Sequence, residues 1–347
     1  MIALLLACAG DELASPAAPD PTTDGAWSVG HRAVVLEDAE RPLTVEVWYP
    51  TEAAPGRTAA PDAFLSGAQQ ADYADWLAAA DPDCPTATTS AVADAAQASG
   101  GSWPAVVFSH CHTCTRFSSF TIAQRLASHG IVVVAPDHRG NTLFDAEPLG
   151  LSAETLELRR ADGIRALDAL LDGSLGIVDI DADAIGAIGH SFGSVTVGAI
   201  AQSDGRVAAA MGIAAPMENP LLLGVEIAAL SVPLMFVVAV EDNSITEAGN
   251  VLIRSNFEAA IAGAHKAEVA DAGHWSFSDL CGLIPAFSPG CGPDDRQTDG
   301  EPFEYLPAAE GRDVAATLAA AFFLQELEGA GALVEAVSLP GVSLESR

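Results

Sequence analysis

Positive charge is scarce in this sequence. Its 347 residues include 15 Lys and Arg against 47 Asp and Glu, and Lys266 is the only lysine. The formal net charge is therefore −32 at pH 7. So few cations can neither neutralise a nucleic acid backbone nor attract an anionic lipid surface, and this composition argues against both as partners. The acidic residues are spread through the chain rather than gathered in a tail, which is typical of a solvated surface.

Aromatic residues are also few, at 6% of the chain, so the core must be built mostly from Ala, Val, Leu and Ile. The hydrophobic opening run, residues 1–8, is too short to cross a bilayer and contains no basic n-region, so it is an incomplete secretory signal. Its end, Leu5-Leu6-Ala7-Cys8, resembles a bacterial lipobox, and residues 9–26 have the composition of a flexible tether. We therefore expect an extracytoplasmic protein, either a lipoprotein attached to the cell envelope through Cys8 or a secreted protein. The alternative is a hydrophobic leader that is simply frayed or buried.

Cysteine is limited to six residues. Cys281 and Cys291 flank a Pro/Gly-rich loop, and in an oxidising compartment they are the expected disulfide. Cys111 and Cys114 could bridge each other, or either could pair with Cys84. In each case one of these three cysteines is left unpaired. Residues 111–114, Cys-His-Thr-Cys, could supply zinc ligands, but the sequence has no second ligand pair at suitable spacing. We therefore expect no metal.

From residue 103 onward, short apolar runs alternate with amphipathic segments. Such runs are typical of strands covered on both faces, and the repeated units imply a mostly parallel α/β sheet of about eight strands with helices on both faces. An antiparallel hairpin is expected at one edge of the sheet. The expected strands are 31–37, 43–49, 105–109, 131–135, 184–190, 207–214, 234–240 and 266–270, and the expected helices are 117–129, 153–171, 194–202, 246–262 and 312–327.

We expect one domain over residues 27–330, preceded by the segment 1–26 and followed by a C-terminal tail, 331–347. The sheet does not need residues 62–101 or 275–306. These two stretches are therefore expected to be insertions near the functional site that form the walls of its pocket.

Residues 184–195 predict a buried strand, a sharp turn and a helix, with Ser191 at the turn. This is the nucleophile-elbow pattern G-x-S-x-G, in which Gly189 and Gly193 avoid collisions between strand and helix. The free N–H groups at the start of the helix favour developing negative charge. We therefore predict that Ser191 is a nucleophile. The alternative is a chance match in a glycine-rich chain.

A serine nucleophile needs a base, and the base needs a carboxylate to orient it. In elbow proteins these residues follow in the order Ser, acid, His, each after a strand. Asp242 ends an apolar run, and His274 follows the last predicted strand. We predict that they are the acid and the base. The alternatives are a helix-capping role for Asp242, a structural role for His274, and Glu241 or Glu218 as the acid.

The oxyanion formed in acyl transfer also needs hydrogen-bond donors. We expect one from the backbone N–H of Phe192 and the other from the loop after the strand 105–109. His112 is the first candidate there and Cys111 the second, both acting through the backbone. His190 lies next to the serine, and we expect its side chain to point away from the cleft.

Five segments together resemble the bacterial α/β-hydrolases, with the platelet-activating-factor-acetylhydrolase-like and "predicted dienelactone hydrolase" proteins as the closest groups. The segments are Thr-Val-Glu-Val-Trp-Tyr-Pro at 44–50, Pro-Ala-Val-Val-Phe-Ser-His at 104–110, Leu-Ala-Ser-His-Gly-Ile-Val-Val at 126–133, Gly-His-Ser-Phe-Gly at 189–193 and Gly-His-Trp-Ser-Phe at 273–277. The resemblance covers residues 27–327. It implies an α/β-hydrolase fold with inserted cap loops, carboxylic ester hydrolysis, a Ser-Asp-His triad and no cofactor.

Three departures from these groups bear on the site. His110-Cys111 stands where His-Gly is usual, so the oxyanion loop can differ in shape. The plasma acetylhydrolase takes its acid from the strand after the elbow helix, where residues 214–216 are Ala-Ala-Pro, so Asp242 has to serve. Dienelactone hydrolases proper use a cysteine nucleophile, from which Ser191 departs.

These observations predict a serine carboxylic-ester hydrolase whose substrates are uncharged small-molecule esters of small to medium size. A lipase, phospholipase or polyester hydrolase could use the same triad, and a peptidase is a further alternative. From a different class, the chain could be a catalytically silent binding protein with a hydrolase fold.

Overall fold

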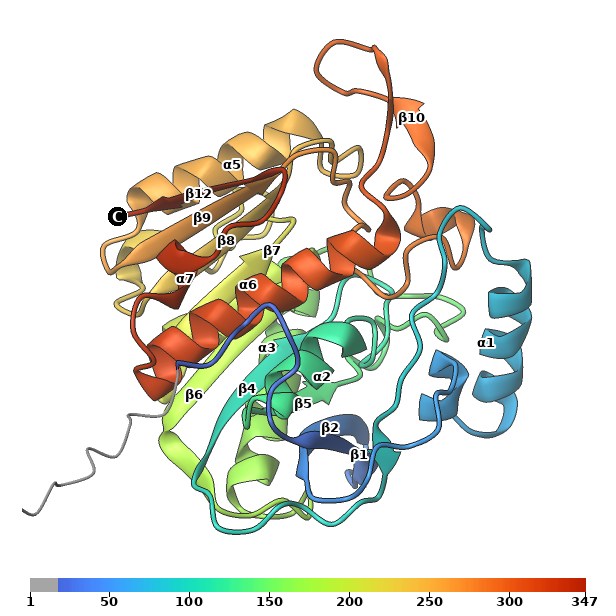
Figure 1. The fold of residues 1–347 in the computed structure, drawn as a ribbon, viewed down its shortest axis with the longest axis vertical. Coiled ribbons are helices and arrows are strands. Elements are labelled where there is room, and N and C mark those ends of the chain that lie inside the picture. Colours follow the sequence, from blue (N-terminus) through green and yellow to red (C-terminus); the bar gives the residue numbers. More distant parts are fainter. Residues whose placement is uncertain (1–17) are drawn as a thin grey trace, which may run out of the picture.

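The computed structural model describes residues 18–347, so Cys8 and the first half of the expected tether, residues 9–17, lie outside the described residues. Its centre is a ten-stranded sheet in the order β12-β9-β8-β7-β6-β4-β5-β2-β1-β3 (Figure 1). The strands from β9 to β5 in this order are mutually parallel and form the middle of the sheet. They are β4 (Trp103–Ser109), β5 (Val132–Pro136), β6 (Ile180–His190), β7 (Val207–Ile213), β8 (Leu234–Ala239) and β9 (Ala264–Val269).

Antiparallel strands flank this parallel block. On one side, β1 (Ser28–Leu36) and β2 (Leu43–Thr51) form the predicted hairpin, with the two-residue strand β3 (Val92–Ala93) outside it. On the other side, β12 (Val342–Ser346) pairs with β9. The expected C-terminal tail is therefore wrong, because its last part is a strand that pairs the backbone groups of β9. β3 and β12 also account for the ten strands where about eight were expected.

Helices cover both faces of the sheet, as predicted. One face carries α2 (Phe120–Ser128) and α6 (Ala308–Glu328), and the opposite face carries α3 (Ala153–Leu171), α4 (Phe192–Ser203) and α5 (Thr246–Ala259). Each face has its own apolar core. Every residue of β4, β5 and β8 is buried, which explains why these strands are almost wholly apolar in sequence.

The helix ends follow local rules. The Ser152 hydroxyl accepts the Thr155 N–H at 3.1 Å and caps the start of α3. Gly130, with φ +97°, follows His129, the C-cap residue of α2, and adopts the left-handed conformation that favours glycine after a helix. Gly329, with φ +67°, ends α6 in the same way. The short helix α7 (Leu333–Ala336) then leads to β12.

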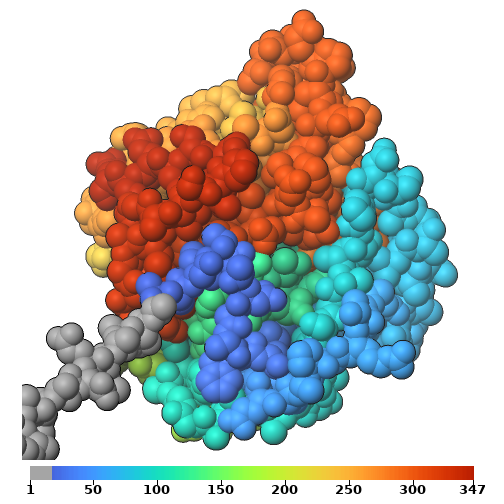
Figure 2. All heavy atoms as spheres, in the orientation of Figure 1, coloured from blue at the N-terminus to red at the C-terminus, as the bar shows by residue number. Residues whose placement is uncertain are grey.

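Parts of the two predicted insertions contact each other, whereas β3 of the first insertion belongs to the sheet, contrary to the expectation that the sheet does not need residues 62–101. The first contains α1 (Gly67–Ala79), and the second carries the projecting β10 (Pro293–Asp295) and β11 (Pro302–Glu304) (Figure 1). Figure 2 shows the two segments, cyan and orange, side by side, and the Asp81 N–H donates to the Gly282 carbonyl at 2.9 Å. None of the helices within residues 18–347 has both the length and the apolar character needed to cross a membrane.

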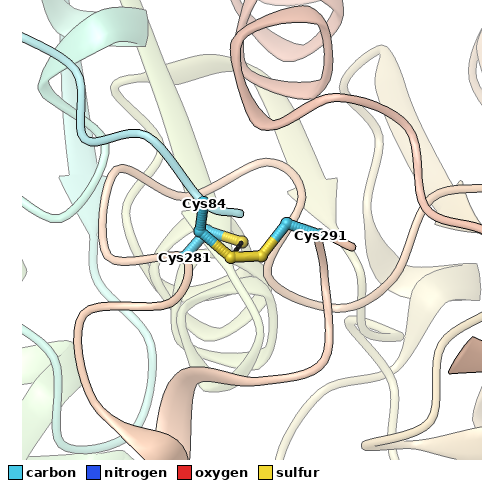
Figure 3. A group of neighbouring side chains, drawn as sticks. All are labelled: Cys84, Cys281 and Cys291. Carbon is cyan, nitrogen blue, oxygen red and sulfur yellow. Dashed lines mark hydrogen bonds between the residues drawn. A yellow bond between two sulfur atoms is a disulfide. The ribbon is translucent and has the colours of Figure 1, made fainter. Parts of the chain in front are cut away.

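The cysteines pair differently from the expected Cys281–Cys291 disulfide. Cys291 is bonded to Cys84, and Cys281 is a free, buried thiol whose Sγ lies 3.9 Å from the Cys84 Sγ (Figure 3). The prediction failed because the second insertion folds onto the loop after α1, which brings a distant cysteine to Cys291. Burial raises the pKa of Cys281 to about 12.

Cys111 and Cys114 bridge each other, which was one of the open alternatives. This disulfide also removes the thiolates that a zinc site on the same segment would need.

Candidate active site

The turn between β6 and α4 holds Ser191 in a strained backbone conformation, with φ 56° and ψ −123°. A Cβ at Gly189 would collide with the backbone of Gly193, and a Cβ at Gly193 would collide with the carbonyl oxygen of Ser109 on β4. The Ser191 N–H donates to the Ile213 carbonyl on β7 at 2.8 Å. Both glycines of the motif are thus required by the close approach of backbone segments.

The loops after β8 and β9 bring the two other predicted residues to Ser191. His274 Nε2 lies 2.8 Å from Ser191 Oγ, and His274 Nδ1 lies 2.7 Å from Asp242 Oδ2. Asp242 is fully buried and His274 is 3% exposed. Three side chains that are far apart in the sequence therefore form one hydrogen-bonded chain at the carboxyl edge of the sheet.

Asp242 does not cap α5, whose N-cap is Ile245 and has no side-chain cap hydrogen bond, but it does hold the turn before that helix. Its other oxygen, Oδ1, accepts the N–H groups of Ser244 and Ile245, each at 2.9 Å, in the turn that leads into α5. The two rival acids are engaged elsewhere. Glu241 accepts from Arg296 at 3.0 Å, and Glu218 accepts the N–H of Ile227 at 2.7 Å.

His190 supports the site in a way that the sequence did not reveal. Its ring is buried, does not line the cavity that contains Ser191, and donates from Nε2 to the backbone carbonyl of His274 at 2.9 Å. Burial, with a smaller effect from His274, lowers the pKa of His190 to about 3, so its ring is neutral. Trp275 packs edge-on against both imidazoles. The position of the His274 loop is therefore fixed by its backbone as well as by Asp242.

The two expected oxyanion donors lie beside Ser191. Phe192 is the first residue of α4, where backbone N–H groups have no partner within the helix. The N–H of His112 donates to no acceptor within residues 18–347. Both residues line the same cavity as Ser191. This arrangement leaves two N–H groups available to an oxyanion on Ser191.

Behind this loop lies a group of polar residues that the sequence analysis missed. Arg159 of α3 is fully buried and donates to the hydroxyl of Ser109 at 3.1 Å, to the carbonyl of His110 and to Asn141. Arg159 lies in an amphipathic helix, and the sequence does not distinguish it from the other polar residues of that helix. No local signal identifies its contacts with the loop after β4.

The cavity at Ser191 has a volume of about 370 Å³. Neither predicted insertion lines it, so the expectation that residues 62–101 and 275–306 form its walls is wrong. Their apolar side chains instead pack into the core cluster that contains α2 and α6. The walls come from α5 and the loop after β7, and the apolar lining residues are Leu151, Phe192, Val195, Ala215, Pro216, Leu221, Leu222, Ile245, Ala248 and Leu252.

Comparison with known proteins identifies the relationship. Residues 90–279 match the model of the dienelactone hydrolase family, and residues 14–145 match that of platelet-activating factor acetylhydrolase, isoform II. No curated protein matched the sequence significantly. Among solved structures, the ferulic acid esterase from Streptomyces cinnamoneus has the same fold, with 23% identity, a TM-score of 0.67, and coverage of 95% of this chain and 98% of that one.

The dienelactone hydrolase match covers more than half of the chain, and the fold is the expected α/β-hydrolase fold. Both family resemblances named from the sequence are confirmed. The chain therefore belongs to the dienelactone hydrolase family and is a carboxylic ester hydrolase.

Proposed function

We propose that this chain is a serine esterase that hydrolyses uncharged esters of small to medium size through an acyl-enzyme on Ser191. The observation that carries the proposal is the continuous hydrogen-bonded path from the Ser191 hydroxyl through His274 to the Asp242 carboxylate. A serine hydroxyl is a poor nucleophile at neutral pH, and this path supplies the base and the oriented partner that it needs.

In the proposed cycle, His274 Nε2 accepts the Ser191 proton as Oγ attacks the ester carbonyl carbon. The backbone N–H groups of Phe192 and His112 stabilise the resulting oxyanion. His274 then gives its proton to the leaving alkoxide, and the acyl group remains on Ser191. A water molecule, deprotonated by His274, attacks this acyl-enzyme, and Ser191 recovers its proton as the carboxylic acid leaves.

The cavity supports the substrate class. Its lining is mostly aliphatic, and no Asp, Glu, Lys or Arg among the described residues lines it. A charged substrate would lose its hydration there without an ionic partner, which is costly. An uncharged acyl or alcohol group buries apolar surface at about 25 cal/mol per Å² instead.

The test is labelling with a fluorophosphonate probe, which reacts with activated serines. The wild-type protein should be labelled, and Ser191→Ala should not be. Ser244→Ala is the matched control, because Ser244 lines the same cavity but donates only its backbone N–H to Asp242. Absence of labelling in folded wild type would support the silent binding protein. Hydrolysis of a peptide amide at a rate close to that of the matched ester would support the peptidase.

Two leucines favour a second candidate, a lipase or polyester hydrolase on the same triad. Leu221 is 87% exposed and Leu151 is 58% exposed, and both line the cavity. Exposed apolar groups around a cavity can contact an insoluble substrate. Leu221→Ser should then reduce hydrolysis of an emulsified triglyceride more than that of a soluble p-nitrophenyl ester. Leu223→Ser is the control, since Leu223 is 75% exposed and lies outside this cavity.

A further inference from the structure

A chain of three hydrogen-bonded side chains runs from the buried side of the oxyanion loop to the cavity. The guanidinium of Arg159 donates from Nη1 to Asn141 Oδ1 at 2.5 Å. Asn141 Nδ2 in turn lies 2.7 Å from His112 Nδ1 and donates to the Leu149 carbonyl at 2.9 Å. Arg159 and Asn141 are buried, whereas His112 is half-buried at the cavity.

This chain fixes the proton on the His112 ring. A guanidinium only donates hydrogen bonds, so the oxygen of the Asn141 amide has to face Arg159. The Leu149 carbonyl only accepts, which independently requires the Asn141 nitrogen on the opposite side. Asn141 therefore donates to His112 Nδ1, and the ring carries its proton on Nε2.

The same surroundings keep the ring neutral. Burial, and then the positive charge of Arg159, lower the pKa of His112. The hydrogen bond that Asn141 donates to Nδ1 also favours the neutral ring, because a protonated Nδ1 could not accept it. Burial also lowers the pKa of Arg159, to about 9, which leaves it charged at neutral pH. The ring of His112 is thus a neutral imidazole of one defined tautomer.

The Nε2–H of His112 has no hydrogen-bond partner within residues 18–347. The ring lies edge-on to Phe192, with 6.3 Å between ring centroids, and borders the mostly aliphatic cavity that contains Ser191. His112 therefore offers this cavity two hydrogen-bond donors, a ring N–H held in a fixed position and a backbone N–H beside the nucleophile. When the carbonyl oxygen of an ester accepts from the backbone N–H of His112, the acyl and alcohol groups next to that carbonyl lie within reach of the ring.

We propose that the His112 side chain determines substrate specificity by donating a hydrogen bond from Nε2 to an uncharged oxygen of the substrate, such as an ether, hydroxyl or carbonyl oxygen near the scissile ester. This inference rests on the proposed esterase function and is separate from the backbone role of His112. Asn141 and Arg159 are positioning residues, since they act only through the orientation and tautomer of the ring.

The test compares esters that differ by one oxygen in place of a methylene. One pair varies the acyl group, p-nitrophenyl 3-methoxypropanoate against p-nitrophenyl pentanoate. The other varies the alcohol, 2-methoxyethyl butanoate against butyl butanoate. One neutral hydrogen bond contributes about 0.5–1.5 kcal/mol, so the wild type should favour the ether of at least one pair in kcat/KM by about 2- to 12-fold.

Two variants of His112 separate its two ring nitrogens. In His112→Gln the side-chain NH₂ can occupy the position of Nε2, and the ether preference should persist. In His112→Asn the amide reaches only as far as Nδ1, and the ratio of the two kcat/KM values should fall to about that of an inert ring, as in His112→Phe. The ratio within a pair cancels any change in overall rate that the altered loop causes.

The outcomes are distinguishable from failure of the proposed function. If wild type is neither labelled by the fluorophosphonate nor active on any ester, the esterase proposal fails first. If wild type is active but favours neither ether, or if His112→Asn keeps the preference shown by the wild type, the role of the ring is refuted. Thermal melting of each variant confirms that the compared proteins are folded.

Discussion

Replacing Asp242 by asparagine tests the hydrogen-bonded chain at its buried end. Ser244 and Ile245 both donate backbone N–H groups to Oδ1 of Asp242, so the oxygen of the new amide should stay on that side. The amide nitrogen would then face His274 Nδ1, which has to become the acceptor. The imidazole proton would move to Nε2, and His274 could no longer take the proton from Ser191.

The expected loss of activity follows from the cost of the alternative orientation of the amide that Asp242→Asn introduces. Turning the amide over would restore the base but would leave the N–H groups of Ser244 and Ile245, whose hydrogen bonds to Asp242 are partly buried, facing an NH₂ group. Each lost hydrogen bond costs about 0.5–1.5 kcal/mol, and the two together about 1–3 kcal/mol. At about 1.4 kcal/mol per factor of ten, Asp242→Asn should lower kcat by about 5-fold to 150-fold.

The assay is steady-state hydrolysis of p-nitrophenyl butanoate, with thermal melting to confirm folding. Glu241→Gln is the matched control, because it removes the neighbouring carboxylate, which contacts Arg296 and not His274. The control should change kcat by less than about twofold. The reasoning is wrong if Asp242→Asn retains kcat within threefold of wild type, or if both variants lose activity equally.

Two further predictions concern the elbow and a buried carboxyl group. Gly193→Ala places a Cβ against a backbone carbonyl and should abolish fluorophosphonate labelling, whereas Gly205→Ala, whose Cβ has free space, should be labelled normally. Burial, opposed in part by Arg312, raises the pKa of Asp279 to about 6. Between about pH 4 and pH 6 the folded protein therefore holds a proton that the unfolded chain releases, and the free energy of unfolding should fall by about 3 kcal/mol as pH rises through this window. Urea unfolding should show this fall relative to Asp279→Asn, and parallel pH profiles for the two proteins would contradict it.

Patterns with a local physical cause were predictable from the sequence. Residues 153–171 match α3 because a serine cap and an amphipathic pattern define that helix. The elbow was predictable because its two glycines are required by contacts between adjacent segments. The order of acid and histidine along the chain then located Asp242 and His274, since parallel strands place their following loops at one edge.

Features that depend on distant contacts were not predictable in this way. The bond from Cys84 to Cys291 joins residues 207 positions apart, and sequence spacing favoured a nearer partner. The cavity walls were assigned to insertions because these were long and apolar, yet their side chains pack into the core. Arg159 and His190 support the site through contacts that leave no periodic or compositional mark.

Pairing of β12 with β9 has a practical consequence for any shortened version of this protein. Cutting the chain after residue 330 would expose the outer backbone of β9 and remove one of the two carboxylates that pair with Lys266, that of Glu345 at 2.9 Å. A strand edge with unpaired backbone N–H and C=O groups can pair with the same edge of another molecule. A truncated protein prepared for crystallisation should therefore precipitate or associate, although every residue around Ser191 would still be present.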